Sequence, residues 1–288
     1  MPNLTILMPV YNGRETIARA VRSTLRAMPC DAELLIIDDG SSDGTVGVLE
    51  RLHQPRLRVL ENDGNLGVAA SLQRGLNSSS SRYVARMDAD DICLPWRFEL
   101  SLRALKAKYD AVFTGVVHFG TGVVRPTEPT TLRSRAFNLT LLMENPFPHP
   151  TFTAKRSHVE KSGGYRHVLA EDYDLWLRMA IAGSRMARLA APTVLYRHHP
   201  SQVTRIEHWR QRALTEPAFV DAYREFVREL FDVDPIWYDD LVAQRDGEGM
   251  SRLEALIECE AAVEGLRVRR NLRRRLGHVS KRRSSSWR

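Results

Sequence analysis

With 288 residues, 43% of them hydrophobic, the chain is long enough for one large domain or for a domain with an appendage. No apolar run approaches the roughly 20 residues that span a bilayer, no signal peptide is recognisable, and the three cysteines are scattered, which together predict a cytoplasmic location. Ten of the 42 Lys and Arg residues lie in 267–288. The rest of the chain therefore has 32 basic and 35 acidic residues, which gives it a net charge of −3. Nucleic acid is therefore not predicted as a partner.

The first hundred residues alternate between strand and helix patterns. Continuous apolar runs indicate buried strands, and apolar residues at helical spacing indicate helices between them. Strands are expected at 4–10, 34–37, 57–60 and 83–87, and helices at 15–28, 45–52, 68–76 and 96–109. This order predicts the α/β class, with a Rossmann-like, mostly parallel sheet flanked by helices.

Polar clusters follow three of the expected strands, at 11–13, 38–42 and 88–91. In parallel sheets covered by helices, ligands bind at the carboxyl ends of the strands, so these clusters are expected to converge on one site. No G-x-G-x-x-G follows the first strand and no P-loop motif occurs in the chain. A nucleotide would therefore be held by carboxylates and a metal rather than by a glycine-rich loop.

The cluster at 88–91 carries three carboxylates directly after a strand. Like charges at such short range raise each other's pKa unless a cation lies among them. Hard oxygen ligands suit Mg²⁺ or Mn²⁺, and such sites often bind substrate phosphates. The cluster indicates a metal-dependent enzyme acting on a phosphorylated substrate. The alternative is a solvated acidic turn or the cap of the next helix.

The pattern loosens after an apolar strand at 111–117. A loop rich in Thr and Pro follows at 121–132, and a proline-dense segment at 145–151 is restricted in shape. A helix is expected at 171–181 and a last short strand at 194–196. The chain from 206 to 266 is expected to be mostly helical.

Several short motifs then match one known family in the right order: PVYN at 9–12, IDDGSSDGT at 37–45, NLGV at 65–68, ARMDADD at 85–91, HPT at 149–151, AEDYDLWLR at 170–178, and YR at 196–197 followed by His199. Over roughly residues 3–204 the chain resembles the family 2 inverting glycosyltransferases with the GT-A fold, of the bacterial cell-surface glycan type. The resemblance implies a GT-A domain at 1–205. Beyond it, the helical pattern predicts a C-terminal extension at 206–266, and the charge distribution marks a basic tail at 267–288.

The resemblance implies a set of nucleotide-binding residues: Pro9, Tyr11, Asn12, Asp39, Asn65 and Asp88. Among them, Asp39 resembles the carboxylate that accepts from the base N–H, and Asp88 resembles the ribose-binding carboxylate. The alternative for Asp39 is a cap of the helix that begins at Thr45.

Asp90 and His199 resemble the ligands of a Mn²⁺ or Mg²⁺ ion that holds the donor diphosphate. For His199 the alternative is a surface histidine. Asp91 is either a second-shell ligand or the cap of the following helix.

Asp172 resembles the base that takes the proton of the acceptor hydroxyl, and Glu171 a residue that orients the acceptor or donor sugar. The alternative for the pair is carboxylates favoured at a helix N-terminus. His149 and Arg197 are candidates for donor or acceptor sugar contacts. His149 could instead hold its proline-rich loop, and Arg197 could instead form a structural ion pair.

The function implied is metal-dependent, inverting transfer of a sugar from a nucleoside-diphosphate sugar, expected to be a UDP-sugar, to a hydroxyl of a saccharide or lipid-linked glycan. Such a reaction would serve the synthesis of cell-surface polysaccharide or lipopolysaccharide. Two alternatives stay open: transfer to polyprenyl phosphate, and a non-catalytic nucleotide-sugar-binding protein.

The basic tail carries Val268, Leu272, Leu276 and Val279 at three- or four-residue spacing. A basic amphipathic helix can lie on an anionic membrane surface, here the inner face of the cytoplasmic membrane. The alternative is a solvated, disordered terminus.

Overall fold

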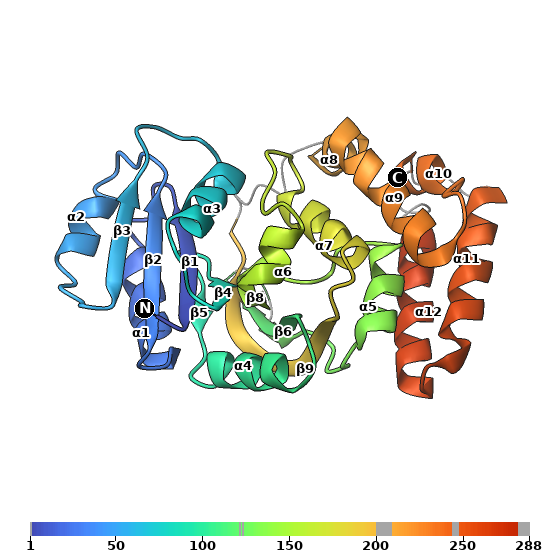
Figure 1. The fold of residues 1–288 in the computed structure, drawn as a ribbon, viewed down its shortest axis with the longest axis horizontal. Helices are drawn as coiled ribbons and strands as arrows, with labels where there is room; N and C mark the ends of the chain where they lie inside the picture. Colours follow the sequence, from blue (N-terminus) through green and yellow to red (C-terminus); the bar gives the residue numbers. More distant parts are fainter. Residues whose placement is uncertain (1, 121, 123, 200–208, 244–247, 282–288) are drawn as a thin grey trace.

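The computed structural model describes residues 2–120, 122, 124–199, 209–243 and 248–281, and within them a single mixed sheet runs through the molecule (Figure 1). Its strand order is β3-β2-β1-β4-β8-β6-β9-β5, and β7 pairs with β6. The strands are β1 (Leu4–Val10), β2 (Ala32–Asp38), β3 (Leu57–Glu61), β4 (Tyr83–Arg86), β5 (Ile92–Cys93), β6 (Ala111–Phe119), β7 (Arg125–Pro126), β8 (Thr153–Lys155) and β9 (Met186–Arg197).

The first four strands are parallel to one another, as the sequence predicted. Leu7 of β1 pairs with Leu35 of β2 on one side and with Arg86 of β4 on the other. This register brings the ends of β1, β2 and β4 to the same edge of the sheet. The polar clusters that follow these strands therefore begin side by side.

Helices cover both faces of the sheet (Figure 1). Because side chains alternate along a strand, Ile6 and Met8 pack into one core with α1 and α4, and Leu7 packs into a second core with α3 and α7. The helices up to this point are α1 (Ile17–Ala27), α2 (Thr45–Glu50), α3 (Val68–Asn77), α4 (Arg97–Ala107), α5 (Ser134–Leu141), α6 (Arg156–Lys161) and α7 (Glu171–Ile181).

The second half of the sheet departs from the sequence prediction. The short strand expected at 194–196 is the end of the twelve-residue strand β9, which runs parallel to β6 with an irregularity between Phe113 and Gly115. The two- or three-residue strands β5 and β8 were not predicted, because segments so short carry no periodicity. β8 pairs antiparallel with β4 and joins the two halves.

The region after 206 is mostly helical in its described part, with α8 (Trp209–Thr215), α9 (Pro217–Phe231), α10 (Tyr238–Ala243), α11 (Glu248–Glu260) and α12 (Leu266–Lys281). These helices gather at the end of the molecule remote from β3 (Figure 1). Pro217 begins α9, where its missing N–H costs nothing. Gly249 lies in the first turn of α11, where a Cβ would come within 2.7 Å of the Trp237 backbone.

The basic tail forms α12 as far as Lys281, and residues 282–288 lie outside the described part. Leu272 is fully buried and Leu276 is 7% exposed, both in the core shared with α7. The expectation that these leucines face a membrane, like the alternative of a disordered tail, is therefore wrong for this segment, because the protein itself covers the apolar face. Arg275 also pairs with Glu144 at 2.6 Å, and Arg274 with Glu128.

In the part of the chain that the structure describes, none of the helices combines the length and the apolar character needed to cross a membrane.

The docking of α12 can be tested with Leu272→Ala. Removing a fully buried leucine should lower the free energy of unfolding by about 2–5 kcal/mol, measured by urea denaturation. The exposed Arg270 of the same helix supplies the control, since Arg270→Ala should change stability by less than about 0.5 kcal/mol. Equal, small effects of the two variants would show that α12 is not packed on the body.

Candidate active site

The loops that follow β1 and β2 are joined by hydrogen bonds. The Asn12 N–H donates to Ser41 Oγ at 2.8 Å, and Asn12 Oδ1 accepts from the Ser42 N–H at 2.9 Å. Asn12 adopts a left-handed backbone, with φ of 51°, a conformation that asparagine tolerates better than most residues. Tyr11 is 52% exposed at this edge, and Pro9 lies within β1 opposite Ile37.

Asp39 holds the start of α3 in place. Its Oδ1 accepts from Asn62 Nδ2 at 2.6 Å and from the Leu66 N–H at 2.9 Å, and its Oδ2 accepts from the Gly67 N–H at 2.9 Å. The capping alternative for Asp39 fails, because the Thr45 N–H donates to Asp43 instead. A carboxylate has about four acceptor positions, so one remains on Asp39.

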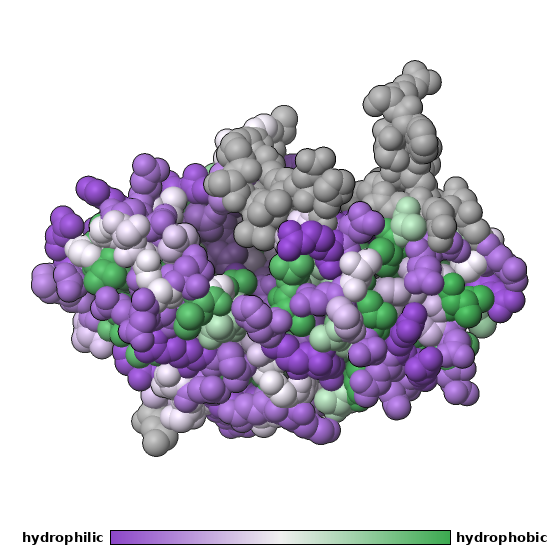
Figure 2. Space-filling model, turned by 90° about the horizontal axis from the view of Figure 1, so that it is seen from above, coloured by the Kyte–Doolittle hydropathy of each residue, from purple (hydrophilic) through white to green (hydrophobic). Residues whose placement is uncertain are grey.

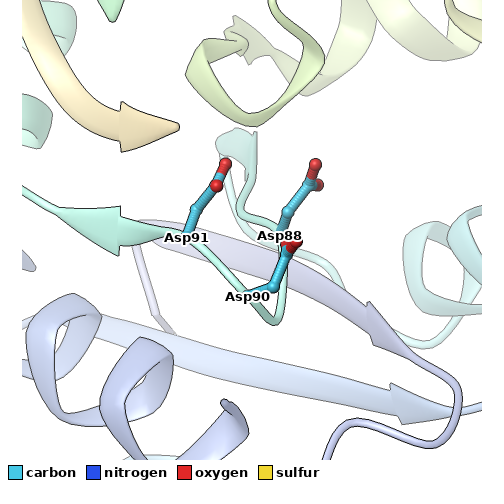
Figure 3. Close-up of side chains that lie close together, drawn as sticks. All are labelled: Asp88, Asp90 and Asp91. Atoms are coloured by element: carbon cyan, nitrogen blue, oxygen red, sulfur yellow. The ribbon is translucent and has the colours of Figure 1, made fainter. Parts of the chain in front are cut away.

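The three carboxylates of Asp88, Asp90 and Asp91 lie together in the turn between β4 and β5 (Figure 3). One oxygen from each falls within 4.8 Å of the others. Burial, together with the neighbouring carboxylates, raises the pKa of Asp90 and Asp91. Asp91 is 1% exposed, and its Oδ2 has no hydrogen-bond partner among the described residues. The turn therefore concentrates negative charge that a cation would stabilise.

The end of β9 comes to this turn from far along the chain. Asp91 Oδ1 accepts from the Arg197 N–H at 2.7 Å, and Arg197 Nε donates to the Asp90 carbonyl at 2.9 Å. His199 Nε2 lies 3.2 Å from Asp90 Oδ2. The structure thus places together the two residues expected to bind a metal. Asp91, whose role was left open, anchors the β9 end.

Arg86 links the acidic turn to α7. Its Nε lies 2.8 Å from Asp88 Oδ1, and its Nη1 lies 3.5 Å from Glu171 Oε1 and donates to His149 Nδ1. Burial opposes the charge of the guanidinium, but Asp88 and Glu171 outweigh it and raise the Arg86 pKa. Arg86 therefore stays charged and connects two carboxylates that come from separate parts of the sequence.

His149 uses both ring nitrogens within the protein. Because Nδ1 accepts from Arg86, the ring proton is on Nε2, which donates to the Tyr165 hydroxyl at 3.0 Å. Burial and the charge of Arg86 lower the pKa of His149 to about 3, so the ring is neutral. This arrangement supports the loop-holding alternative for His149 over a polar contact with a sugar.

Glu171 and Asp172 occupy the first turn of α7. Burial raises the pKa of both side chains, and the charge of Glu171 raises that of Asp172 further. Asp172 Oδ2 accepts from Asn145 Nδ2 at 3.0 Å. Asp174 is fully buried and pairs with Arg166 and Arg178, which makes it a structural residue.

A cavity of about 650 Å³ brings these groups together. Figure 2 looks onto this edge of the sheet and shows a hollow of mainly hydrophilic colour. Of the residues expected to act, four line the cavity: Asp88, His149, Glu171 and Asp172. The other expected nucleotide and metal residues lie along the same edge but outside this lining.

Sequence reasoning missed Asn62, Asn145 and Tyr165. Asn62 follows β3 as the polar clusters follow β1, β2 and β4, and that position could have revealed it. Asn145 stands in the proline-dense segment without any motif of its own. Tyr165 follows Gly163 and Gly164, a pair that marks a special backbone, and its N–H donates to Gln73 Oε1 at 2.7 Å.

The family model of Glycosyl transferase family 2 matches residues 5–163, more than half of the chain. The chain belongs to this family. It is therefore a glycosyltransferase, as predicted. The putative glycosyltransferase EpsE of Bacillus subtilis is 32% identical over 64% of this chain and 69% of its own length. The amylovoran biosynthesis glycosyltransferase AmsE of Erwinia amylovora is 28% identical over 71% of this chain and 80% of its own.

Solved structures confirm the GT-A fold of this family 2 chain. S. aureus TarS 1–349 in complex with UDP-GlcNAc has a TM-score of 0.62 at 15% identity, covering 100% of this chain and 91% of its own. The mannosyltransferase PcManGT of Pyrobaculum calidifontis, in complex with GDP-Man and Mn²⁺, has a TM-score of 0.56 at 19% identity, covering 100% and 88%.

The bridging role of Arg86 can be tested with Arg86→Met. The variant leaves Asp88 and Glu171 without their shared cation, and loss of one partner of a buried pair costs about 3–5 kcal/mol of stability. Chemical denaturation measures the loss. Arg22→Met, at an exposed position of α1, is the matched control and should have little effect. If Arg86→Met were as stable as the control, the two carboxylates would not depend on Arg86.

Proposed function

We propose that this glycosyltransferase moves a sugar, with inversion and with a divalent metal, from a nucleoside-diphosphate sugar to a hydroxyl of a saccharide. The observation that carries the proposal is the shared cavity, which is lined both by Asp88 of the acidic turn and by the half-buried Asp172. A donor held at the turn would present its sugar toward Asp172.

The donor proposed is a UDP-sugar. Tyr11 offers an exposed ring face for the base, Asp39 keeps one acceptor position for a base N–H, and Asp88 lies where a ribose would reach the turn. Asn12 and Asn65 shape the loops around the nucleotide, and Asn65 Oδ1 accepts from the Gly67 N–H at 3.1 Å. The UDP-GlcNAc complex of TarS supports a nucleotide-sugar donor for a fold of this kind.

The acidic turn fits a divalent cation. Mn²⁺ and Mg²⁺ accept the ligands offered here by Asp90, by the nearby His199 and by Asp91, whose Oδ2 has no hydrogen-bond partner within the described part of the chain. When bound, such an ion stabilises the negative charge that develops on a leaving diphosphate. The neighbour PcManGT, solved with GDP-Man and Mn²⁺, supports the use of a metal.

Asp172 is proposed to act as the general base. As the acceptor oxygen attacks the anomeric carbon, Asp172 takes the hydroxyl proton, and the bond from that carbon to the diphosphate oxygen breaks with inversion. Burial raises the pKa of Asp172, which makes it a stronger base than an exposed aspartate, and Asn145 orients its carboxylate. Glu171, held by Arg86, orients the sugar beside it, and Arg197 holds the metal-binding turn.

The acceptor proposed is a saccharide or lipid-linked glycan in the synthesis of a bacterial surface polysaccharide. The relative AmsE, a glycosyltransferase of amylovoran biosynthesis, supports this assignment. The reaction would take place in the cytoplasm.

Asp172→Asn tests the base. The amide cannot accept the proton, so transfer should fall by about 10²- to 10⁴-fold, measured as release of UDP in the presence of acceptor. Binding of the donor, measured by calorimetry, should stay within about twofold. The exposed Asp239→Asn on α10 is the matched control and should transfer normally. Near-normal turnover by Asp172→Asn would remove Asp172 from the role of base.

The metal is tested with a chelator and with Asp90→Asn. Removing divalent ions with EDTA should abolish transfer by the native protein, and Mn²⁺ should restore it. In Asp90→Asn, restoration should need a much higher Mn²⁺ concentration, since a neutral amide replaces one anionic ligand. Asp63→Asn, exposed and outside the turn, should respond as the native protein does. Transfer that is indifferent to EDTA would contradict the metal site.

A further inference from the structure

A second cavity, of about 230 Å³, lies behind Asp172 between α7 and the helices α8 to α10. Asn145, Asp172 and Trp209 line both this cavity and the larger one. Asp172 therefore has one cavity on the side of the acidic turn and another on the side of the C-terminal helices. Apart from Ala170, Asp172 and Tyr173, the residues that line the second cavity lie outside the family motifs.

Ring faces form much of its wall. Tyr173, Phe219, Tyr223 and Tyr238 line it and are nearly or fully buried. The hydroxyls of the three tyrosines donate to backbone carbonyls: Tyr173 to Leu141, Tyr223 to Leu142 at 2.6 Å, and Tyr238 to Leu214 at 2.5 Å. With their hydroxyls thus engaged, the tyrosines offer the cavity apolar ring surface.

The lining also has polar members. Glu144, Asn145, Asp172 and Arg210 belong to it, and Trp209 Nε1 is buried without a hydrogen-bond partner among the described residues. Glu144 is fixed by Arg275 of α12 at 2.6 Å. The cavity thus combines apolar ring surface with polar groups, and Asp172 is one of them.

Most of the residues that line the cavity are buried, so it can enclose a small ligand. Its 230 Å³ equals roughly eight waters at about 30 Å³ each, which is comparable to the bulk of one sugar ring. A pyranose matches such a lining, because its C–H faces are apolar and its rim carries hydroxyls. A wholly apolar ligand would leave the buried Nε1–H of Trp209, which has no partner among the described residues, facing carbon.

We infer that the second cavity is a subsite for one sugar unit of the acceptor, with ring C–H groups on the aromatic wall and hydroxyls toward Asn145 and Asp172. The inference rests on the proposed function, since it assigns the acceptor to the side of Asp172 opposite the donor. It also gives the C-terminal helices a part in recognising the acceptor.

The experiment uses the full chain with UDP and Mn²⁺ and two probes, methyl β-glucoside and octyl β-glucoside below its micelle concentration. Saturation-transfer NMR should show transfer to ring protons of both probes. Ala213→Leu, whose added carbons enter the cavity from the fully buried Ala213 of α8, should reduce that transfer several-fold. Ala255→Leu, at an exposed position of α11, adds the same carbons elsewhere and should leave it unchanged.

Equal ring-proton transfer in native protein and Ala213→Leu would overturn the inference, as would its absence from the native protein. Transfer to the octyl chain alone would overturn it in favour of an apolar occupant. A cooperative thermal unfolding transition would confirm that Ala213→Leu is folded. If the variant does not fold, the presence or absence of ring-proton transfer in the native protein tests the inference. Binding of UDP is titrated in the same samples to separate the two proposals. Failure of the native protein to bind UDP would count against the proposed function. The comparison of ring-proton transfer would still test whether the cavity binds a sugar.

Discussion

The guanidinium of Arg86 is the contact on which the site depends. It is buried where β4 ends, and it lies between Asp88 of the acidic turn and Glu171 of α7. Without a cation there, two carboxylates would be held in a poorly hydrated region with no compensation, which is costly. Burial and the same guanidinium lower the pKa of His149 and keep it neutral, and the hydrogen bond from Arg86 holds it in a single tautomer. One side chain thus sets the relative positions of the acidic turn, the proline-rich loop and α7.

In the acidic turn, by contrast, the negative charge is not fully balanced by cationic side chains. Arg197 and His199 approach it from the end of β9, yet the pKa values of Asp90 and Asp91 stay raised and one oxygen of Asp91 has no hydrogen-bond partner among the described residues. The protein's own cations therefore compensate the turn only in part. Such incomplete compensation is typical of a site prepared for a metal and for the diphosphate that it binds.

The C-terminal helices extend the same core rather than forming a separate unit. Phe219, Tyr223 and Phe226 of α9 belong to the cluster that contains Trp176 of α7. Leu272 of α12 enters it as well, and Arg275 reaches Glu144 next to Asn145. A segment that looks like a charged tail in the sequence is thereby connected, through two short contacts, to the carboxylate of Asp172.

The sequence by itself determined the parallel half of the sheet and the residues at its edge. Local signals suffice there, because buried parallel strands are continuous apolar runs and their ligand-binding residues follow directly after them. Motif order likewise singled out Asp90 and His199, which the structure places 3.2 Å apart, and it is the basis for proposing Asp172 as the base. Only the tertiary structure decided what Asn145, Tyr165 and Arg86 do, since each acts on a partner far away in the chain and has no periodicity of its own. The tertiary structure also decided where α12 packs. An amphipathic pattern indicates that an apolar face must be covered, and only the fold shows that the protein's own core covers it.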